Sequence, residues 1–256
     1  MDKFYTKPEV VDACLKTLSL GGYFCVEPSA GNGEFFNKLP NPKLGLDIEP
    51  ESPDIRSQDF FAFEGVATQK KIAVVGNPPF GRNSSLAIDF FNHAAKFADM
   101  IAFVVPKTFK KTSVQNRLNL GWDLWLTIDL DPNSFYIAET GKDFSANCCW
   151  QVWFPAKTVR QKVKLPTLHK DFLFTSRDKA NIAIRRVGAL AGRVYAEGFD
   201  NYSPNSNYFI LCDDRITSRL QSLQEQFRDV ASWTVANPSL SKSELVQIYT
   251  DNYSEY

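Results

Sequence analysis

Brief apolar runs alternate with amphipathic stretches along the first 120 residues, and this alternation restricts the folds open to the chain. The runs are β-branched or aromatic and are bounded by Gly, Pro, Asp or Asn, as buried strands are: "YFCVEPS", "KLGLDIE", "KIAVVGN" and "MIAFVVP". The stretches at 9–18, 84–98 and 112–118 carry apolar residues at helical spacing. Alternating strands and helices predict an α/β fold with a doubly wound, mostly parallel sheet.

The pattern changes after residue 120. Residues 124–131 and 148–154 resemble strands, but the turn-rich segment 131–147 between them shows no helical spacing. Two strands joined in this way favour a hairpin, because parallel strands need a longer crossover. We therefore predict that a β-hairpin closes the sheet.

The last hundred residues have a different composition. Residues 157–193 hold ten Lys and Arg against two Asp, in a chain whose net charge is zero. Strand-like runs follow, and then helical ones at 215–233 and 241–249. These features predict a domain over 1–156 and a small α+β extension over 157–256. Composition alone leaves phosphate contacts and a solvated basic face equally open for the basic segment.

Several functional classes find no support in the sequence. The five cysteines form no CxxC pair and no ligand spacing with His93 or His169, which favours reduced thiols and no metal: Cys14, Cys25, Cys148, Cys149 and Cys212. The first residues lack the basic and apolar regions of a signal peptide, and no apolar run is long enough to span a bilayer. We therefore expect a cytoplasmic protein without a membrane anchor.

A glycine turn follows the first predicted strand, in "VEPSAGNGEFF". Gly31 and Gly33 form half of the fingerprint that lets a dinucleotide approach the backbone closely. The other half is missing, because Phe36 stands where the third glycine would be, and Glu34 would repel a pyrophosphate. The turn favours a nucleoside cofactor without phosphates, preferably a cationic one. Alone, the turn is more typical of an ordinary connection between a strand and a helix.

Two acidic residues follow at positions that suit a nucleoside. Asp47 ends the second predicted strand, where a carboxylate accepts hydrogen bonds from ribose hydroxyls, and Glu49 is the alternative. Asp59 ends the next short strand and could accept from an adenine amino group while Phe60 or Phe61 covers the ring. Each acid alone is typical of a solvated loop, but their order after a glycine turn favours cofactor binding.

The loop "NPPF" follows the fourth predicted strand, the run "KIAVVGN". Asn77 precedes a proline and is therefore extended, while Pro78 and Pro79 each fix φ and offer only a carbonyl. The Asn77 side-chain oxygen and the Pro78 carbonyl form a rigid pair of acceptors for the two N–H groups of an exocyclic amine. Phe80 supplies a stacking face for the base. Geometry and preorganised electrostatics suffice for such a reaction, without a strong general base.

These motifs, after "YTKPEVVDACLKTL", resemble S-adenosylmethionine-dependent amino-methyltransferases, in particular the N6-adenine methyltransferases of nucleic acids. The resemblance rests on "EPSAGNGEF", "GLDIEP", "QDFF" and "NPPF" and covers residues 5–154. It implies a class I methyltransferase-like Rossmann fold with S-adenosyl-L-methionine as the cofactor. The cofactor site that it implies comprises Thr6, Glu27, Pro28, Ala30, Gly31, Gly33, Asp47, Ile48, Asp59, Phe60 and Asn77.

The same resemblance implies roles within the site. Thr6 and the Gly31 loop would contact the methionine part of the cofactor, Asp47 the ribose and Asp59 the adenine. The catalytic motif Asn77-Pro78-Pro79-Phe80 would hold the target amine.

Family members carry one more aromatic residue, which stacks on the target base. Phe135 fits this role best and Phe144 second. A target base in a duplex would have to be extruded, and Phe80 would receive it.

Basic residues are expected to contact the nucleic-acid backbone. Lys107, Lys110 and Lys111 follow the fifth strand and are expected on the binding rim. Arg185 and Arg186 alternate across a predicted strand of the tail, so that at most one of them faces a ligand. The family places target recognition after the catalytic domain when the cofactor motifs come first, as they do here.

The leading hypothesis is an enzyme that methylates the N6 amine of adenine in nucleic acid, with DNA slightly favoured over RNA. Methylation of a protein glutamine amide is the first alternative, because that family shares Asn-Pro-Pro before an aromatic residue; the basic tail disfavours it. The second alternative is an inactive nucleic-acid-binding subunit, which the intact motifs disfavour. The oligomeric state, the recognition site and a need for a partner subunit stay open.

Overall fold

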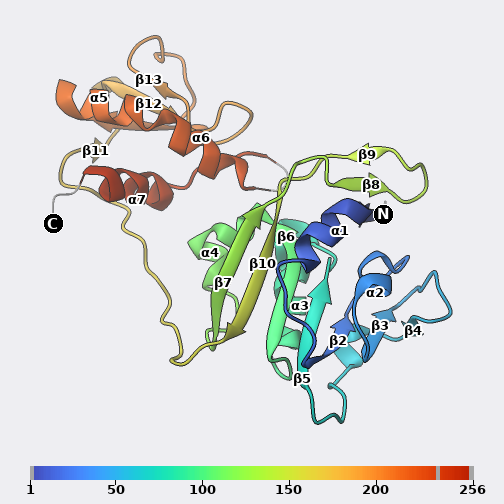
Figure 1. Cartoon of the computed structure of the whole chain (residues 1–256). Helices are drawn as coiled ribbons and strands as arrows, with labels where there is room; N and C mark the ends of the chain where they lie inside the picture. Colours follow the sequence, from blue (N-terminus) through green and yellow to red (C-terminus); the bar gives the residue numbers. More distant parts are fainter. Residues whose placement is uncertain (1–2, 235–236, 254–256) are drawn as a thin grey trace. The chain divides into compact units, whose positions relative to one another are not determined.

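Seven strands form the main sheet among the residues that the structure describes, 3–234 and 237–253. In this computed structural model the strand order is β4-β3-β2-β5-β6-β10-β7 (Figure 1). Neighbouring strands from β4 to β6 are parallel, and β10 is antiparallel to both β6 and β7. The strands are β2 (Tyr23–Glu27), β3 (Lys43–Asp47), β4 (Arg56–Ser57), β5 (Lys71–Gly76), β6 (Met100–Pro106), β7 (Trp122–Asp129) and β10 (Cys148–Pro155). The predicted doubly wound, mostly parallel sheet closed by a hairpin is confirmed.

Both faces of this sheet are buried, which explains why its strands are continuous apolar runs. In β5, Ile72 and Val74 belong to one core cluster and Ala73 and Val75 to the other. Helix α3 packs on the first face, and α1 and α2 pack on the second. The helices and 3-10 turns are α1 (Pro8–Leu15), α2 (Glu34–Lys38), α3 (Ser85–Ala94), α4 (Thr112–Gln115), η1 (Phe60–Ala62), η2 (Arg82–Ser84) and η3 (Lys107–Lys110).

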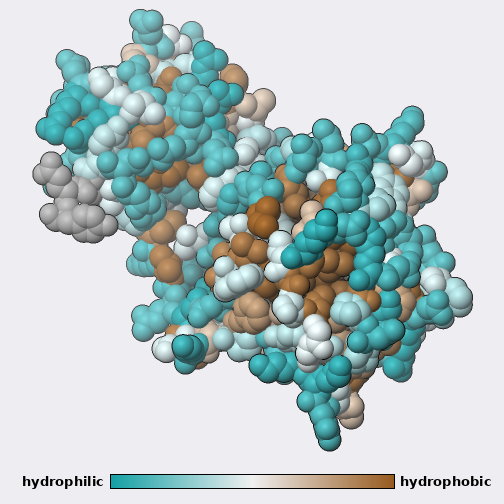
Figure 2. All heavy atoms as spheres, viewed as in Figure 1, coloured by the Kyte–Doolittle hydropathy of each residue, from teal (hydrophilic) through white to brown (hydrophobic). Residues whose placement is uncertain are grey.

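Strand β10 lies inside the sheet although it comes last along this part of the chain. Trp150 and Trp153 are fully buried, on opposite faces of the sheet. Their indole N–H groups donate to Thr17 Oγ1 at 3.0 Å and to Gln151 Oε1 at 3.1 Å, respectively. On the face that carries α1, Leu126 and Phe154 are only partly buried, and apolar residues gather at the surface of this unit (Figure 2).

A second, small antiparallel sheet was not anticipated from the sequence. It consists of β1 (Phe4–Thr6), β8 (Phe135–Ile137) and β9 (Asp143–Phe144), in the order β1-β8-β9. The last two strands lie in the connection between β7 and β10, which was expected to hold only turns. The N-terminal strand is therefore fixed by a segment about 130 residues later in the chain.

The chain divides into two compact units, Met1–Lys162 and Val163–Tyr256. The second unit contains an antiparallel sheet of order β11-β14-β12-β13, formed by β11 (Leu173–Phe174), β12 (Ile182–Arg185), β13 (Val194–Tyr195) and β14 (Asn207–Leu211). Helices α5 (Asp214–Ser222), α6 (Gln224–Ser232) and α7 (Lys242–Tyr253) pack on one face, and η4 (Arg177–Lys179) precedes β12. The expected long helix over 215–233 is two helices, which meet at Leu223.

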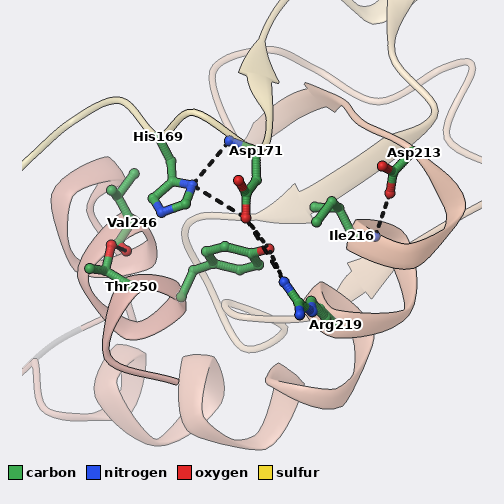
Figure 3. Close-up of polar contacts among 8 residues, drawn as sticks. His169, Asp171, Asp213, Ile216, Arg219, Val246 and Thr250 are labelled. Carbon is green, nitrogen blue, oxygen red and sulfur yellow. Dashed lines mark hydrogen bonds and ion pairs between the residues drawn. The ribbon is translucent and has the colours of Figure 1, made fainter. Parts of the chain in front are cut away.

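A buried polar network fixes the start of the second unit (Figure 3). The fully buried Tyr249 of α7 donates from its hydroxyl to Asp171 Oδ2 at 2.9 Å, and Arg219 Nη1 of α5 lies 3.9 Å from the same oxygen. The His169 ring stacks on Phe172, and its Nδ1 accepts from the Asp171 N–H at 3.2 Å. The network joins residues 169–172 to two helices of the unit.

None of the helices in the described ranges combines the length and apolar character needed to cross a bilayer.

Candidate active site

The glycine turn follows β2, and its Gly31 lies against the ring of Tyr5. Gly31 and Gly33 have φ values of 49° and 88°, in the left-handed region that favours glycine. A Cβ at Gly31 would lie 2.6 Å from Cε1 of the Tyr5 ring. Glycine is therefore required at position 31 both by its backbone conformation and by the lack of space.

Asp47 holds this turn through its side chain. Its Oδ2 accepts from the Gly31 N–H at 2.8 Å, and its Oδ1 accepts from the Glu49 N–H at 2.8 Å. Each carboxylate oxygen can accept more than one hydrogen bond, so a hydroxyl of a ligand can still bind there. Ile48 follows with 72% of its surface exposed. Glu49, the alternative ribose residue, is 74% exposed at its side chain and pairs with Lys3 at 3.3 Å.

Asp59 begins the 3-10 turn η1, where its Oδ1 accepts from the Phe61 N–H at 2.9 Å. The prediction for Phe60 needs correction. Phe60 is only 2% exposed and packs against Phe63 and Phe90 in the core, so its ring is not available to a cofactor. Successive side chains of a tight turn point in different directions, and Phe61 is the one that faces out, with 40% of its surface exposed.

The "NPPF" loop passes close to Glu27. At Gly76, where β5 ends, φ is 157°, and a Cβ there would lie 3.0 Å from the Glu27 Cγ. Asn77 follows at once, then a buried Pro78 and an exposed Pro79. Phe80 is half-buried, and its carbonyl accepts from the Leu86 and Ala87 N–H groups at 3.2 Å each. The loop is thus fixed to β5 at one end and to α3 at the other.

Two non-glycine residues in the left-handed region follow this loop. Asn83 has φ 52° and Ser84 has φ 60°. The Ser84 hydroxyl is fully buried and lies 2.7 Å from Thr108 Oγ1 in η3. Such backbone conformations cost energy in residues other than glycine and are kept only where the surroundings fix them.

Three predicted site residues have buried side-chain oxygens without a hydrogen-bond partner in the described part of the chain. They are Thr6 Oγ1, Glu27 Oε2 and Asn77 Oδ1. Buried polar atoms in proteins are nearly always paired, so these three indicate groups that await a ligand. Glu27 lies against Gly76, the residue before Asn77, and Tyr5, the residue before Thr6, lies against Gly31 of the glycine turn.

Glu27 is buried and has an unusual protonation equilibrium. Burial raises the pKa of this carboxyl well above its usual range, and the negative charges of Asp47 and Glu34 add to the rise. The Glu27 carboxyl would therefore gain most from a neighbouring cation, such as an ammonium group. Within the described residues, no group of three His, Cys, Asp or Glu side chains is arranged to hold a metal ion.

The prediction that Phe135 stacks on a target base also needs correction. Phe135 is opposite Thr6 in the β1–β8 pair and is only 1% exposed, because its ring fills the core beneath α1. Phe144, the second candidate, is half-buried and stacks on Phe4 with the ring centroids 4.2 Å apart. One face of the Phe144 ring is therefore already covered.

Sequence reasoning missed Tyr5 and Tyr136, which lie beside the glycine turn. The Tyr136 hydroxyl accepts from Asn32 Nδ2 at 2.9 Å and donates to Glu34 Oε1 at 3.4 Å. The Tyr5 hydroxyl donates to Glu51, and the two tyrosine rings meet edge to face at 5.9 Å. The period-two pattern of "SFYI" could have indicated that Tyr136 faces away from the core that holds its neighbour.

The predicted lysine rim is only partly available. Lys107 and Lys110 both pair with Asp129, at 3.2 and 3.0 Å. Burial works against ionisation of Asp129, but the hydrogen bonds from Lys110 and Lys107 outweigh it and lower the pKa of this carboxyl. The prediction for Lys111 needs correction. This residue is only 7% exposed, because it precedes α4 where the chain turns inward, so it is not a rim contact.

Arg185 and Arg186 belong to the second unit. Arg185 donates from Nε to the Val187 carbonyl at 3.0 Å. The Arg186 guanidinium lies over the Tyr208 ring, 5.3 Å from its centroid.

The chain was compared with known proteins. No protein-family model matches it, and a search of the curated proteins finds no match. Among solved structures it is similar to a modification subunit of a putative type I restriction enzyme from Vibrio vulnificus, at 15% identity over 60% of this chain, with a TM-score of 0.44. The chain spans 45% of that subunit's length.

Two further solved structures are similar over about the same part of the chain. A putative RNA methyltransferase from Pyrococcus horikoshii matches 58% of this chain and 82% of its own, with 12% identity and a TM-score of 0.41. The 23S rRNA methyltransferase ErmE matches 60% and 70%, with 16% identity and a TM-score of 0.42. Likenesses this weak do not assign an activity.

Proposed function

We propose that the chain binds S-adenosyl-L-methionine and transfers its methyl group to the exocyclic N6 amine of adenine in nucleic acid. The observation that carries the proposal is the Asn77 side-chain oxygen. It is buried, has no hydrogen-bond partner in the described residues, and stands in a loop fixed at both ends. An acceptor held in this way is suited to an amino group of a ligand.

The residues around the glycine turn fit the cofactor. Glu27, with its raised pKa, would receive the α-ammonium group, and Thr6 Oγ1 would bind the amino-acid part. Asp47 would accept from the ribose while it keeps the turn in place. Asp59 would accept from the adenine amine, with the exposed side chains of Ile48 and Phe61 beside the ring. When bound, the cofactor supplies an electrophilic methyl group on a sulfonium.

The "NPPF" loop would position the second substrate. Asn77 Oδ1 and the Pro78 carbonyl would accept the two N–H groups of the target amine, so that its lone pair points out of the base plane. The half-buried Phe80 would stack on the base. These residues act by orientation and fixed dipoles and need no proton acceptor of high pKa. The leaving proton would pass to water.

The first experiment measures transfer of labelled methyl from S-adenosylmethionine to duplex DNA, single-stranded DNA, total RNA and a protein lysate, followed by nucleoside analysis. Label in N6-methyladenosine or its deoxy form is the expected result and also names the polymer. Label only in protein would overturn the proposal in favour of a glutamine amide. Cofactor binding without label in any arm would instead support the inactive nucleic-acid-binding subunit.

The Asn77→Ala variant tests the key residue. We expect transfer to fall by roughly 100-fold or more, as when one preorganised hydrogen-bonding group is removed from an active site, with cofactor affinity within about twofold of the wild type. Asn133→Ala is the matched control, because Asn133 is exposed in the turn before β8. Full turnover by Asn77→Ala would remove this residue from the reaction.

A further inference from the structure

The sheet of the second unit has two faces with different character. Ile182, Ile184 and Ile210 pack against α5, α6 and α7 on one face. On the other face, Ala183 and Phe209 are covered by Phe199 and Tyr202, from the connection between β13 and β14. The rest of this second face carries arginine and tyrosine side chains.

Two arginines lie opposite each other on this face. The Arg185 N–H donates to the Arg193 carbonyl at 2.9 Å, and the Gly192 N–H donates to the Arg185 carbonyl at 2.7 Å, which makes Arg185 and Arg193 neighbours across the strands. Side chains of cross-strand neighbours point to the same face. Neither arginine makes an ion pair with any of the described residues. Like charges in this position repel, and a bound anion would relieve the repulsion.

Aromatic rings lie beside these charges. Tyr195 is next to Arg193 along the same face, and the Arg193 guanidinium lies 5.2 Å from the centroid of its ring. Tyr202 meets Tyr195 edge to face, with the centroids 5.0 Å apart. Arg177 donates from Nη1 to the Tyr202 carbonyl at 3.2 Å, which adds a third guanidinium. Both tyrosines are half-buried, so part of each ring is open to solvent.

Asn207 borders Arg185 on the other side, in the register of the β12–β14 pair. Its Nδ2 donates to the Ser203 carbonyl at 2.9 Å and so fixes the connection that carries Tyr202. Its Oδ1 is buried and has no hydrogen-bond partner within the described ranges. The face therefore holds a buried acceptor without a hydrogen-bond partner next to arginines that form no ion pair with the described residues.

We propose that this arginine–tyrosine face, formed by Arg177, Arg185, Arg193, Tyr195 and Tyr202, binds single-stranded nucleic acid. Guanidinium groups bind phosphates in a planar, bidentate geometry. Tyrosine rings bind bases by stacking, for which the base must be unpaired and its flat side open. The face combines both groups. A duplex, whose bases are already paired and stacked, would use only the guanidinium groups. The inference rests on the proposed function in one respect: the polymer assigned to this face is the class of substrate proposed for methyl transfer.

Arg186 shows that the arrangement is specific to one face. It follows Arg185 directly, but its guanidinium lies over Tyr208, a residue packed against the helical side of the sheet. The arginines of this segment are thus divided between the two faces of the sheet. Only one face has two arginines opposite each other beside partly exposed tyrosine rings.

The test is binding of fluorescent 12-nucleotide single-stranded DNA, single-stranded RNA and duplex DNA to the full chain without cofactor, measured by anisotropy at several salt concentrations. We expect tighter binding of the single strands than of the duplex. The Arg185→Gln/Arg193→Gln variant should bind single strands at least tenfold more weakly and lower the salt slope by about 1.4, the value for two lost phosphate contacts. Tyr195→Leu should weaken binding by about 5- to 150-fold, the range for one stacked base, at an unchanged slope.

Arg215→Gln, on the exposed side of α5, is the matched control for charge, and thermal unfolding checks that each variant is folded. Equal losses in Arg215→Gln and in the double variant would overturn the inference, since binding would then follow net charge. A preference for duplex, or full affinity in Tyr195→Leu, would also overturn it. Failure of the proposed function would give a different result. If single strands bind through these residues but no methyl group is transferred, the proposed function fails and this inference stands.

Discussion

Ser84 Oγ and Thr108 Oγ1 lie 2.7 Å apart in the core, and this pair joins the exit of the "NPPF" loop to the turn after β6. It holds Ser84 and its neighbour Asn83 in left-handed conformations that neither residue favours. The position of the proposed amine-binding loop therefore depends on a contact outside the site.

We predict that Ser84→Ala destabilises the protein by about 1–3 kcal/mol, because the buried Thr108 hydroxyl loses its partner. The kcat of methyl transfer should fall while cofactor affinity is kept, since the loop loosens but the cofactor residues stay in place. Urea unfolding and steady-state kinetics measure both effects. Thr108→Val completes a double-mutant cycle, and strictly additive effects of the two substitutions would contradict the coupling.

The second prediction concerns Asp47, whose two oxygens accept from the Gly31 and Glu49 N–H groups. Asp47→Asn places the amide NH2 group of asparagine against one of these N–H donors, so the glycine turn should distort. The free energy of cofactor binding should then become less favourable by about 1.5–3 kcal/mol. Glu49→Gln should change it by less than about 0.5 kcal/mol, as an exposed surface substitution does. Calorimetric titration compares the two. A larger effect in Glu49→Gln would move the ribose contact to that residue.

The third prediction is a pH dependence caused by Glu27. In the unfolded chain this carboxyl ionises near its ordinary pKa of 4.5, whereas in the folded protein its pKa is raised. Between these values the folded state binds more protons than the unfolded state. The contribution of Glu27 to the free energy of unfolding is therefore complete below the unfolded pKa and is lost as the pH rises through the folded pKa.

Glu27→Gln removes this titration, so its stability relative to the wild type should increase from pH 4.5 to pH 8.5. Urea unfolding across this range measures the difference, and a constant difference would contradict the raised pKa. Cofactor binding should also release a proton from the wild type, because a bound ammonium favours the ionised carboxylate. Calorimetry in two buffers of different ionisation enthalpy detects this release, which Glu27→Gln should lack.

The fourth prediction tests the network of Figure 3. Tyr249→Phe removes the hydroxyl that donates to Asp171 at 2.9 Å and should destabilise the second unit by about 1.5–3 kcal/mol, the range for a hydrogen bond to a charged group. Limited proteolysis and thermal unfolding report on this unit. In Tyr253→Phe, an exposed hydroxyl bond to Ser222 is lost, and the cost should stay below about 1 kcal/mol. Equal losses of stability in the two variants would mean that the bond to Asp171 contributes no more to stability than an exposed hydrogen bond does.

The sequence predicted the main sheet well, because period and strand boundaries are local properties. Residues 72–76 are five successive apolar or glycine positions, all of them buried, and such a run can be recognised without knowing which strands pair with it. The glycine turn and the acidic residues each follow a parallel strand, and the carboxyl ends of these strands lie along one edge of the sheet. Their positions in the sequence were therefore enough to predict that they share this edge.

The errors in the site arose where a contact joins distant parts of the chain. Phe135 is buried because β8 pairs with β1, a long-range contact that no local pattern reveals. The choice between Phe60 and Phe61 depended on a tight turn of only three residues, whose direction the sequence does not specify. Lys111 was expected at the rim because charge suggested exposure, yet the turn before α4 carries it inward.

The place of β10 bears on how the protein is made on the ribosome. Of the described strands, β7 pairs with β10 alone, so β7 has no partner in the sheet until Cys148–Pro155 has been synthesised. Until then the fully buried β6 is an open apolar edge in the nascent chain. We therefore expect the first unit to fold in one late step, after β10 leaves the exit tunnel, and to need protection by chaperones during translation.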